Sequence, residues 1–275
     1  MDKEEFLKKL EAELKISSNS THTIRNYLSS NKFLLDFANK TPEEITHEDV
    51  KSYLAEKLNN ASSMTKILFL SAIKYSFSNI LKKDITIDIK RPKKEKKIPS
   101  VLSKEEVKSL MDSIQNKKSK LMVSLTYAAG LRVSELVNLK THDFDFTQKT
   151  GHIRQDKGRK DRIFNIPENL LEDLQKQAEK QKEKNQLFLF SSFKGQMTTR
   201  NIQKIVSKVA KKVGIEKEVH PHTLRHSFAT HLLENGTDIR HIQKLLGHSS
   251  LNTTQVYTNI SAEQIKKIKS PIDSP

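Results

Sequence analysis

Residues 220–257 read HPHTLRHSFATHLLENGTDIRHIQKLLGHSSLNTTQVY, and this stretch decides the fold of the second half of the chain. Apolar residues recur in it at helical spacing, which predicts helices over about 221–235 and 238–246. His222 and Arg225 are three residues apart, so they share one face of the first helix. An imidazole and a guanidinium therefore project from the same side of this segment.

Two more reactive side chains follow the second helix. Gly247 suits the left-handed conformation that often closes a helix, and His248 comes directly after it. Tyr257 follows nine residues later, within a further helix expected over 250–257. The candidate reactive groups of this segment are thus the imidazoles of His222 and His248, the guanidinium of Arg225 and the phenol of Tyr257.

A second arginine opens a helix far upstream. The apolar residues from Leu121 to Ala129 predict a buried helix that ends at Gly130. Arg132 then stands at the start of the next helix. Glu135, three residues further on, is placed to orient that arginine or its helix.

Between about 144 and 166 the hydrophobic period becomes two, which is typical of strands. The segments 144–146, 152–154 and 162–166 predict a small three-stranded antiparallel sheet. Turns are expected at 149–151 and 157–159, which puts Lys157 at the tip of the second hairpin.

These residue types match what cleavage of a phosphodiester requires without a metal. Negative charge grows on the non-bridging oxygens as a nucleophile adds, and guanidinium groups meet it with two donors each. The leaving 5′ oxygen needs a proton. A tyrosine nucleophile, with a pKa of about 10, needs a base to activate it. Two arginines, an acid, a base and a nucleophile are all present.

Four segments together resemble the signature of the tyrosine recombinase (phage integrase) family, in its order and spacing. They are Gly130-Leu131-Arg132-x-x-Glu135, His222-x-x-Arg225, Leu246-Gly247-His248 and Tyr257. The resemblance covers essentially the whole chain and is closest to the Xer recombinases, in particular the archaeal type. A lone His-x-x-Arg would mean little, whereas the four segments together are specific.

The resemblance implies roles for the phosphate-binding residues and the nucleophile. Arg132 and Arg225 would clamp the scissile phosphate, and His248 would donate a hydrogen bond to it. Tyr257 would attack, which leaves a 3′-phosphotyrosyl link and a free 5′ hydroxyl. The energy of the broken bond is kept in that link, so we expect no metal, ATP or other cofactor.

The resemblance also implies a proton donor and a proton acceptor. Lys157 would protonate the 5′ oxygen, and His222 would accept the proton of the tyrosine. Asp156 departs from the family pattern, in which glycine commonly precedes the lysine. An acid beside Lys157 would raise its pKa and weaken it as a donor unless the acid points to solvent.

The fold class expected is mainly α with a small antiparallel β-sheet, in two domains. A helical, SAM-like core-binding domain is expected over 1–89 and a basic linker over 90–99. The α+β catalytic domain is expected over 100–275. Its other predicted helices cover about 103–114, 167–183, 199–213 and 261–269, and the last of these would be a docking helix that binds a neighbouring protomer.

Charge and composition point to the same partner. The chain of 275 residues has 49 Lys and Arg against 33 Asp and Glu, a net charge of +16, and no cysteine. Such an excess attracts polyanions, and cysteine-ligated zinc and thiol nucleophiles are excluded. We expect a cytoplasmic protein without a membrane span that binds double-stranded DNA. The family resemblance implies a homotetramer on two DNA sites, with Arg200 on a helix that could approach a groove.

Several alternatives stay open. The resemblance to the Xer recombinases implies chromosome-dimer resolution as the biological role, with integration of a mobile element as the alternative. A type IB topoisomerase-like enzyme would use the same attack, and a DNA-binding protein with decayed catalysis would lack it. The histidines at 220, 222, 226 and 231 suggest a metal site, but the segment lacks the glutamate of the His-Glu-x-x-His motif. His226 and His231 are more simply packing residues or phosphate contacts.

Overall fold

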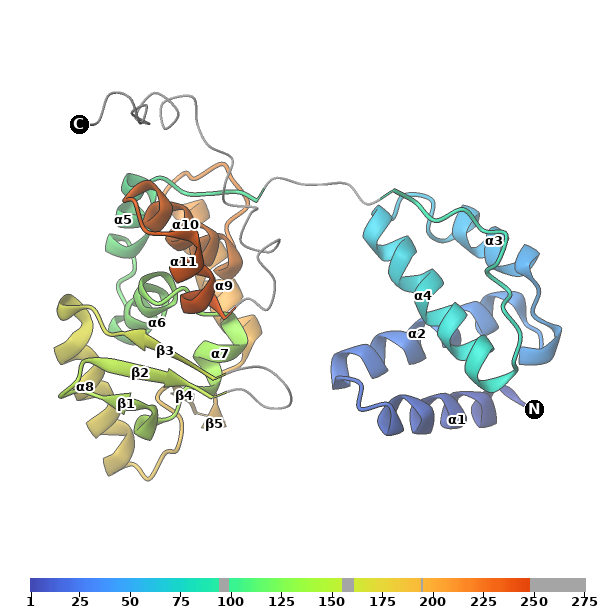
Figure 1. Cartoon of the computed structure of the whole chain (residues 1–275), viewed down its shortest axis with the longest axis horizontal. Coiled ribbons are helices and arrows are strands. Elements are labelled where there is room, and N and C mark those ends of the chain that lie inside the picture. Colours follow the sequence, from blue (N-terminus) through green and yellow to red (C-terminus); the bar gives the residue numbers. More distant parts are fainter. Residues whose placement is uncertain (94–98, 155–160, 194, 248–275) are drawn as a thin grey trace, which may run out of the picture. The chain divides into compact units, whose positions relative to one another are not determined.

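The computed structural model describes residues 1–93, 99–154, 161–193 and 195–247 of the chain (Figure 1). The chain divides into two compact units, Met1–Lys97 and Ile98–Pro275. The first is helical, and the second is mainly helical with small antiparallel sheets. The predicted fold class is confirmed.

The N-terminal unit is built from helices with polar residues at their starts. Its elements are α1 (Lys3–Ile16), α2 (Thr21–Ala38), the 3-10 helix η1 (Pro42–Glu44), α3 (His47–Glu56) and α4 (Ser63–Ile80). Ser20, Thr46 and Ser62 each accept a hydrogen bond from a backbone amide in the first turn that follows. These side chains satisfy amides that a helix leaves unpaired, and so they fix where each helix begins.

The first unit buries an aromatic and aliphatic core between α1, α2 and α4. Phe6 of α1 contacts Phe77 of α4, with ring centroids 5.3 Å apart. A buried polar pair also joins two helices, since the hydroxyl of Ser76 donates to the side-chain oxygen of Asn31. Both residues are fully buried, and the bond between them fixes how α2 and α4 face each other.

The second unit begins with four short helical elements and a sheet. They are α5 (Lys104–Asp112), α6 (Lys117–Ala128), α7 (Val133–Asn138), η2 (Thr141–Asp143), β1 (Phe144–Asp145), β2 (Thr150–Ile153) and β3 (Arg162–Asn165). The rest comprises α8 (Glu168–Glu183), β4 (Ser191–Ser192), β5 (Gly195–Gln196), α9 (Thr199–Lys212), α10 (Pro221–Glu234) and α11 (Ile239–Leu246). The predicted helices that lie in described residues are present, with ends shifted by a few residues.

Helix α6 forms the centre of this unit. Every side chain from Leu121 to Thr126 is buried, and α8, α9 and α10 all pack against this helix. In Figure 1, α6 lies between α10 and the strands. The part of α6 from Leu121 to Thr126 is buried on all sides and has little freedom to move, so the segment 129–132 starts from a fixed point.

The three-stranded antiparallel sheet has the predicted order, β1-β2-β3. The turn predicted at 149–151 is wrong at two positions, because Thr150 and Gly151 belong to β2. Gly151 pairs with Phe164, and a Cβ at Gly151 would lie 2.2 Å from the Phe164 ring. The glycine there allows close packing rather than a turn. The turn predicted at 157–159 lies outside the described residues.

The strands β4 and β5 pair as a separate two-stranded sheet that the sequence did not predict. Among the helices of the described residues, none has the length and apolar character needed to cross a bilayer.

Candidate active site

The turn between α6 and α7 places the first candidate residue, Arg132. Gly130 has a φ of +55°, and a Cβ there would lie 2.5 Å from Phe228 and 2.9 Å from Leu246. Only glycine meets both the backbone and the space requirement. The turn leaves Arg132 as the N-cap of α7, as predicted.

Arg132 and Glu135 bind each other twice. The backbone amide of Arg132 donates to Glu135 Oε2 at 2.7 Å, and Arg132 Nη1 donates to Glu135 Oε1 at 2.6 Å. The Arg132 side chain is 23% exposed, whereas that of Glu135 is 6% exposed. The arginine is therefore held from the protein side and presents part of its guanidinium to solvent.

Arg225 reaches the same place from α10. Its Nη1 donates to the carbonyl of Gly130 at 2.6 Å, and its Nη2 donates to the carbonyl of Leu246 at 2.6 Å. Nη1 also lies 3.6 Å from Glu135 Oε2. The side chain is only 3% exposed, so this guanidinium is fixed by α7, the turn before it and the end of α11.

A third arginine, Arg162 of β3, completes the cluster, and the sequence interpretation did not assign it a role. Its Nη2 donates to Glu135 Oε2 at 2.7 Å, and its Nη1 donates to the carbonyl of Leu245. Its side chain is 4% exposed. The available signal was the strand period, since Arg162 shares the inward face of β3 with buried Phe164.

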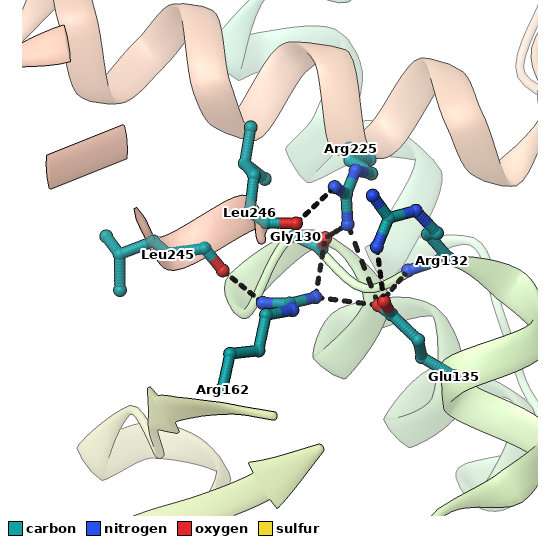
Figure 2. A network of polar contacts seen from close by, with 7 residues as sticks. All are labelled: Gly130, Arg132, Glu135, Arg162, Arg225, Leu245 and Leu246. Atoms are coloured by element: carbon teal, nitrogen blue, oxygen red, sulfur yellow. Dashed lines mark hydrogen bonds and ion pairs between the residues drawn. The ribbon is translucent and has the colours of Figure 1, made fainter. Parts of the chain in front are cut away.

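Three guanidinium groups therefore surround one buried carboxylate, as Figure 2 shows. Burial alone would raise the pKa of Glu135, but the charge of Arg162, the amide of Arg132 and the charges of Arg225 and Arg132 outweigh it and lower the pKa. The carboxylate is ionised at neutral pH, and the cluster keeps a net positive charge.

His222 lies beside this cluster on α10 and is exposed. Partial desolvation, together with the positive charges of Arg225 and Arg132, lowers the pKa of His222. Its imidazole is therefore neutral near pH 7 and able to accept a proton. The structure thus brings His222, Arg132 and Arg225 together.

The other α10 histidines behave as packing residues. The His226 side chain is half-buried, and desolvation lowers the pKa of His226 to about 4, with smaller effects from His222 and Arg225. His231 is buried, and its Nδ1 lies 2.8 Å from the hydroxyl of Tyr127. Among the described residues, no group of three or more His, Asp or Glu side chains is placed to hold a metal.

The remaining candidate residues, Lys157, His248 and Tyr257, lie outside the described residues, as does Asp156. The structure describes the chain up to Gly247, directly before His248. Gly247 closes α11 with a φ of +63°, as predicted. A Cβ at Gly247 would lie 2.9 Å from Cδ of Arg162, so the end of α11 packs directly on the arginine cluster.

Helix α9 supplies an exposed basic face in the same unit. Ile202, Val206 and Ala210 are buried, and the opposite face carries exposed Arg200, Lys204 and Lys208. No acidic residue interrupts the helix. Such a stripe suits the regular spacing of phosphates along a nucleic acid.

The chemistry available to this site follows from its geometry. A phosphate that gains negative charge would meet the partly exposed guanidinium of Arg132, with the buried charges of Arg225 and Arg162 beneath it. The orientation of these groups is set before the phosphate arrives, which is the arrangement that stabilises a transition state most effectively. The neutral imidazole of His222 adds a proton acceptor at the exposed edge.

Comparison with known proteins places this site in a family context. Residues 100–264 match the phage integrase family, and residues 6–87 match the phage integrase N-terminal SAM-like domain. The chain is 36% identical over 269 residues to tyrosine recombinase XerA of Thermococcus kodakarensis. That match covers 96% of this chain and 93% of the relative.

The solved structures that are similar to most or all of the chain include two Xer recombinases. One is XerA recombinase, which is 33% identical, with a TM-score of 0.57 and 96% of each chain covered. The other is XerH site-specific recombinase bound to palindromic difH substrate as a post-cleavage complex. It is 25% identical, with a TM-score of 0.72, and the match covers 88% of this chain and 78% of that one.

Proposed function

Since the chain belongs to the phage integrase family and is a tyrosine recombinase of the Xer type, we propose that it exchanges DNA strands at a specific site through a 3′-phosphotyrosyl intermediate on Tyr257. The observation that carries the proposal is the cluster of Arg132, Arg225 and Arg162 around Glu135, with His222 at its exposed edge.

In the proposed cleavage step, the scissile phosphate binds against Arg132 and Arg225. His222 takes the phenolic proton, and the oxygen of Tyr257 forms a bond to phosphorus while the bond from phosphorus to the 5′ oxygen breaks. Lys157 gives its proton to that oxygen, which leaves as a hydroxyl, and His248 donates a hydrogen bond to the phosphate. Attack by another 5′ hydroxyl reverses these steps and rejoins the strand.

The lowered pKa of His222 supports its role as the base, because a protonated imidazole could not accept the phenolic proton. Arg132 is the more exposed of the two proposed phosphate ligands. We assign to Arg225 an electrostatic contribution from just beneath the surface, where low dielectric strengthens it.

The wider assembly is also part of the proposal. Residues 1–89 would contact DNA together with the exposed face of α9, residues 90–99 would link the two domains, and residues 100–275 would carry the catalysis. Four protomers would act on two DNA sites, with the segment over 261–269 docking on a neighbour. The XerH relative was solved with its difH substrate, which supports DNA as the partner. We propose chromosome-dimer resolution as the biological role, with integration of a mobile element as the alternative.

A nicked DNA substrate tests the proposal, because the short fragment released after cleavage diffuses away and traps the covalent complex. The wild-type chain should give an adduct that survives denaturing electrophoresis, and Tyr257→Phe should bind the same DNA without forming it. A topoisomerase-like enzyme would relax supercoiled DNA that lacks a defined site, and a decayed DNA-binding protein would give no adduct on any sequence.

A further inference from the structure

We propose that Arg162 is a positioning residue of the cleavage site, which sets Arg132 and Arg225 in place by holding Glu135 and the end of α11. The inference rests on the proposed function, because it concerns the same strand cleavage. Arg162 itself is 4% exposed and does not need to touch the phosphate.

The contacts of Arg162 join segments that are distant in sequence. From β3 its guanidinium reaches the carboxylate of Glu135 in α7, the carbonyl of Leu245 in α11 and, at 3.5 Å, the carbonyl of Gly130 in the turn before α7 (Figure 2). Gly130 also accepts from Arg225. One buried group therefore connects the turn and helix that carry Arg132 with the end of α11. Arg225 reaches the same turn and the end of α11 from α10.

Glu135 transmits this effect to Arg132 and Arg225. Its Oε2 accepts from Arg162 Nη2 and from the Arg132 amide, and its Oε1 accepts from Arg132 Nη1. Arg225 Nη1 stands 3.6 Å from the same Oε2. Without Arg162, that oxygen would attract Arg225 away from the Gly130 and Leu246 carbonyls, which would shift the guanidinium beneath the phosphate.

The fold leaves room for the Arg162 side chain. Among the described residues its Nη1 and Nη2 have hydrogen-bond partners, whereas its buried Nε has none. Arg162 occupies an inward position of β3, as Phe164 does two residues later. Gly247 has no Cβ, and a Cβ there would lie only 2.9 Å from Cδ of Arg162. A buried ion pair adds little to stability compared with well-packed apolar residues of the same volume. Stability alone does not account for a charge here, whereas orientation of the catalytic arginines does.

The test compares Arg162→Met and Arg162→Lys with the wild type in three measurements. These are thermal stability, affinity for site DNA, and the single-turnover rate of adduct formation on the nicked substrate. Methionine keeps the volume without the donors. Lysine keeps the charge, but its compact ammonium cannot span the acceptors that a guanidinium fork reaches.

Both variants should bind DNA within about threefold of the wild type. Arg162→Met should form adduct about 100-fold more slowly, as expected for a displacement of about 1 Å at a reacting centre. Arg162→Lys should lie between Met and wild type. Phe164→Leu is the matched control, because it loosens the same face of the same strand without touching the arginine cluster. It should lower the melting temperature and leave the adduct rate within about threefold, measured well below melting.

A double-mutant cycle with Glu135→Gln separates positioning from general destabilisation. If Arg162 acts through Glu135, the double variant should be scarcely slower than the slower single variant, whereas independent effects would multiply. If Arg162→Met does not fold, the Lys variant decides: a folded, DNA-binding Arg162→Lys that cleaves at the wild-type rate overturns the proposal.

The outcomes distinguish this inference from the proposed function. If the wild-type chain forms no adduct on site DNA, the proposed function fails. If the wild type forms adduct and folded Arg162→Met forms it as fast, the proposed function stands and the positioning role of Arg162 is refuted.

Discussion

Arg132 and Glu135 close the first turn of α7 on each other, with the amide of Arg132 2.7 Å from one carboxylate oxygen and its Nη1 2.6 Å from the other. The same oxygen that receives the amide also receives Arg162. The carboxylate of Glu135 thus both caps the start of α7 and serves as the counter-ion of the guanidinium cluster. Both roles depend on the carboxylate being charged.

Glu135→Gln should therefore destabilise the protein strongly. The neutral side chain of glutamine would leave the buried guanidinium groups without a compensating charge. Removing one partner of a buried ion pair costs about 3 kcal/mol. Equilibrium unfolding in denaturant measures the loss. Glu172→Gln is the matched control, since Glu172 pairs with Lys176 on the exposed face of α8 and should cost less than about 1 kcal/mol. Equal losses from the two substitutions would contradict the buried role of Glu135.

Two glycines at helix ends offer a matched pair. Both Gly247 and Gly236 have positive φ, at +63° and +84°, but a Cβ at Gly236 would meet nothing within 4 Å. Gly236→Ala should cost about 1 kcal/mol from backbone strain alone. In Gly247→Ala the new Cβ would also clash with Cδ of Arg162. The free energy of unfolding of this variant should therefore fall further, and its rate of adduct formation should drop. Equal losses of stability in the two variants would show that the Arg162 side chain moves aside at no cost.

The basic stripe on α9 predicts the salt dependence of DNA binding. Each phosphate neutralised contributes about −0.9 to the slope of log affinity against log salt concentration. Lys204→Ala should reduce the magnitude of that slope by about that amount. Lys182→Ala, on the exposed surface of α8, should leave it unchanged. A flat response to salt in the wild-type chain would refute phosphate contacts as the main source of affinity.

The depressed pKa of His226 predicts a loss of stability in mild acid. The folded state holds the pKa of this residue at about 4, against 6.5 for the ordinary value. As the pH falls below 6.5, His226 binds a proton in the unfolded chain, whereas in the folded chain it binds one only near pH 4. Stability should therefore fall across that window, by at most about 1.4 kcal/mol per pH unit from this group. Unfolding free energies of His226→Gln should show a shallower decline, and a decline as steep as in the wild type would rule out His226 as a source.

Local signals in the sequence were sufficient for most of the fold. Side chains that cap helices, such as Ser103 with Glu106, act within a few residues, so α5 begins where predicted. Period-two alternation likewise located the three strands. Gly151 misled the interpretation, because glycine favours a turn and also permits close packing in a strand. Only the distant partner, Phe164, distinguishes the two cases.

The site was predictable where the family motif carries it and not elsewhere. Arg132, Arg225 and His222 could be selected from spacing and residue type, and the structure brings them together. Arg162 could not, because its meaning depends on Glu135 and Leu245, which come from other elements. An arginine at an inward strand position was the only local sign, and such a sign does not identify its partners.

The most direct measurement is mass spectrometry of the covalent complex after protease and nuclease digestion. The proposed chemistry predicts one modified peptide, with a nucleotide attached through its 3′ phosphate to the phenolic oxygen of Tyr257. A nucleotide on any other residue, or a 5′ linkage on Tyr257, would contradict it.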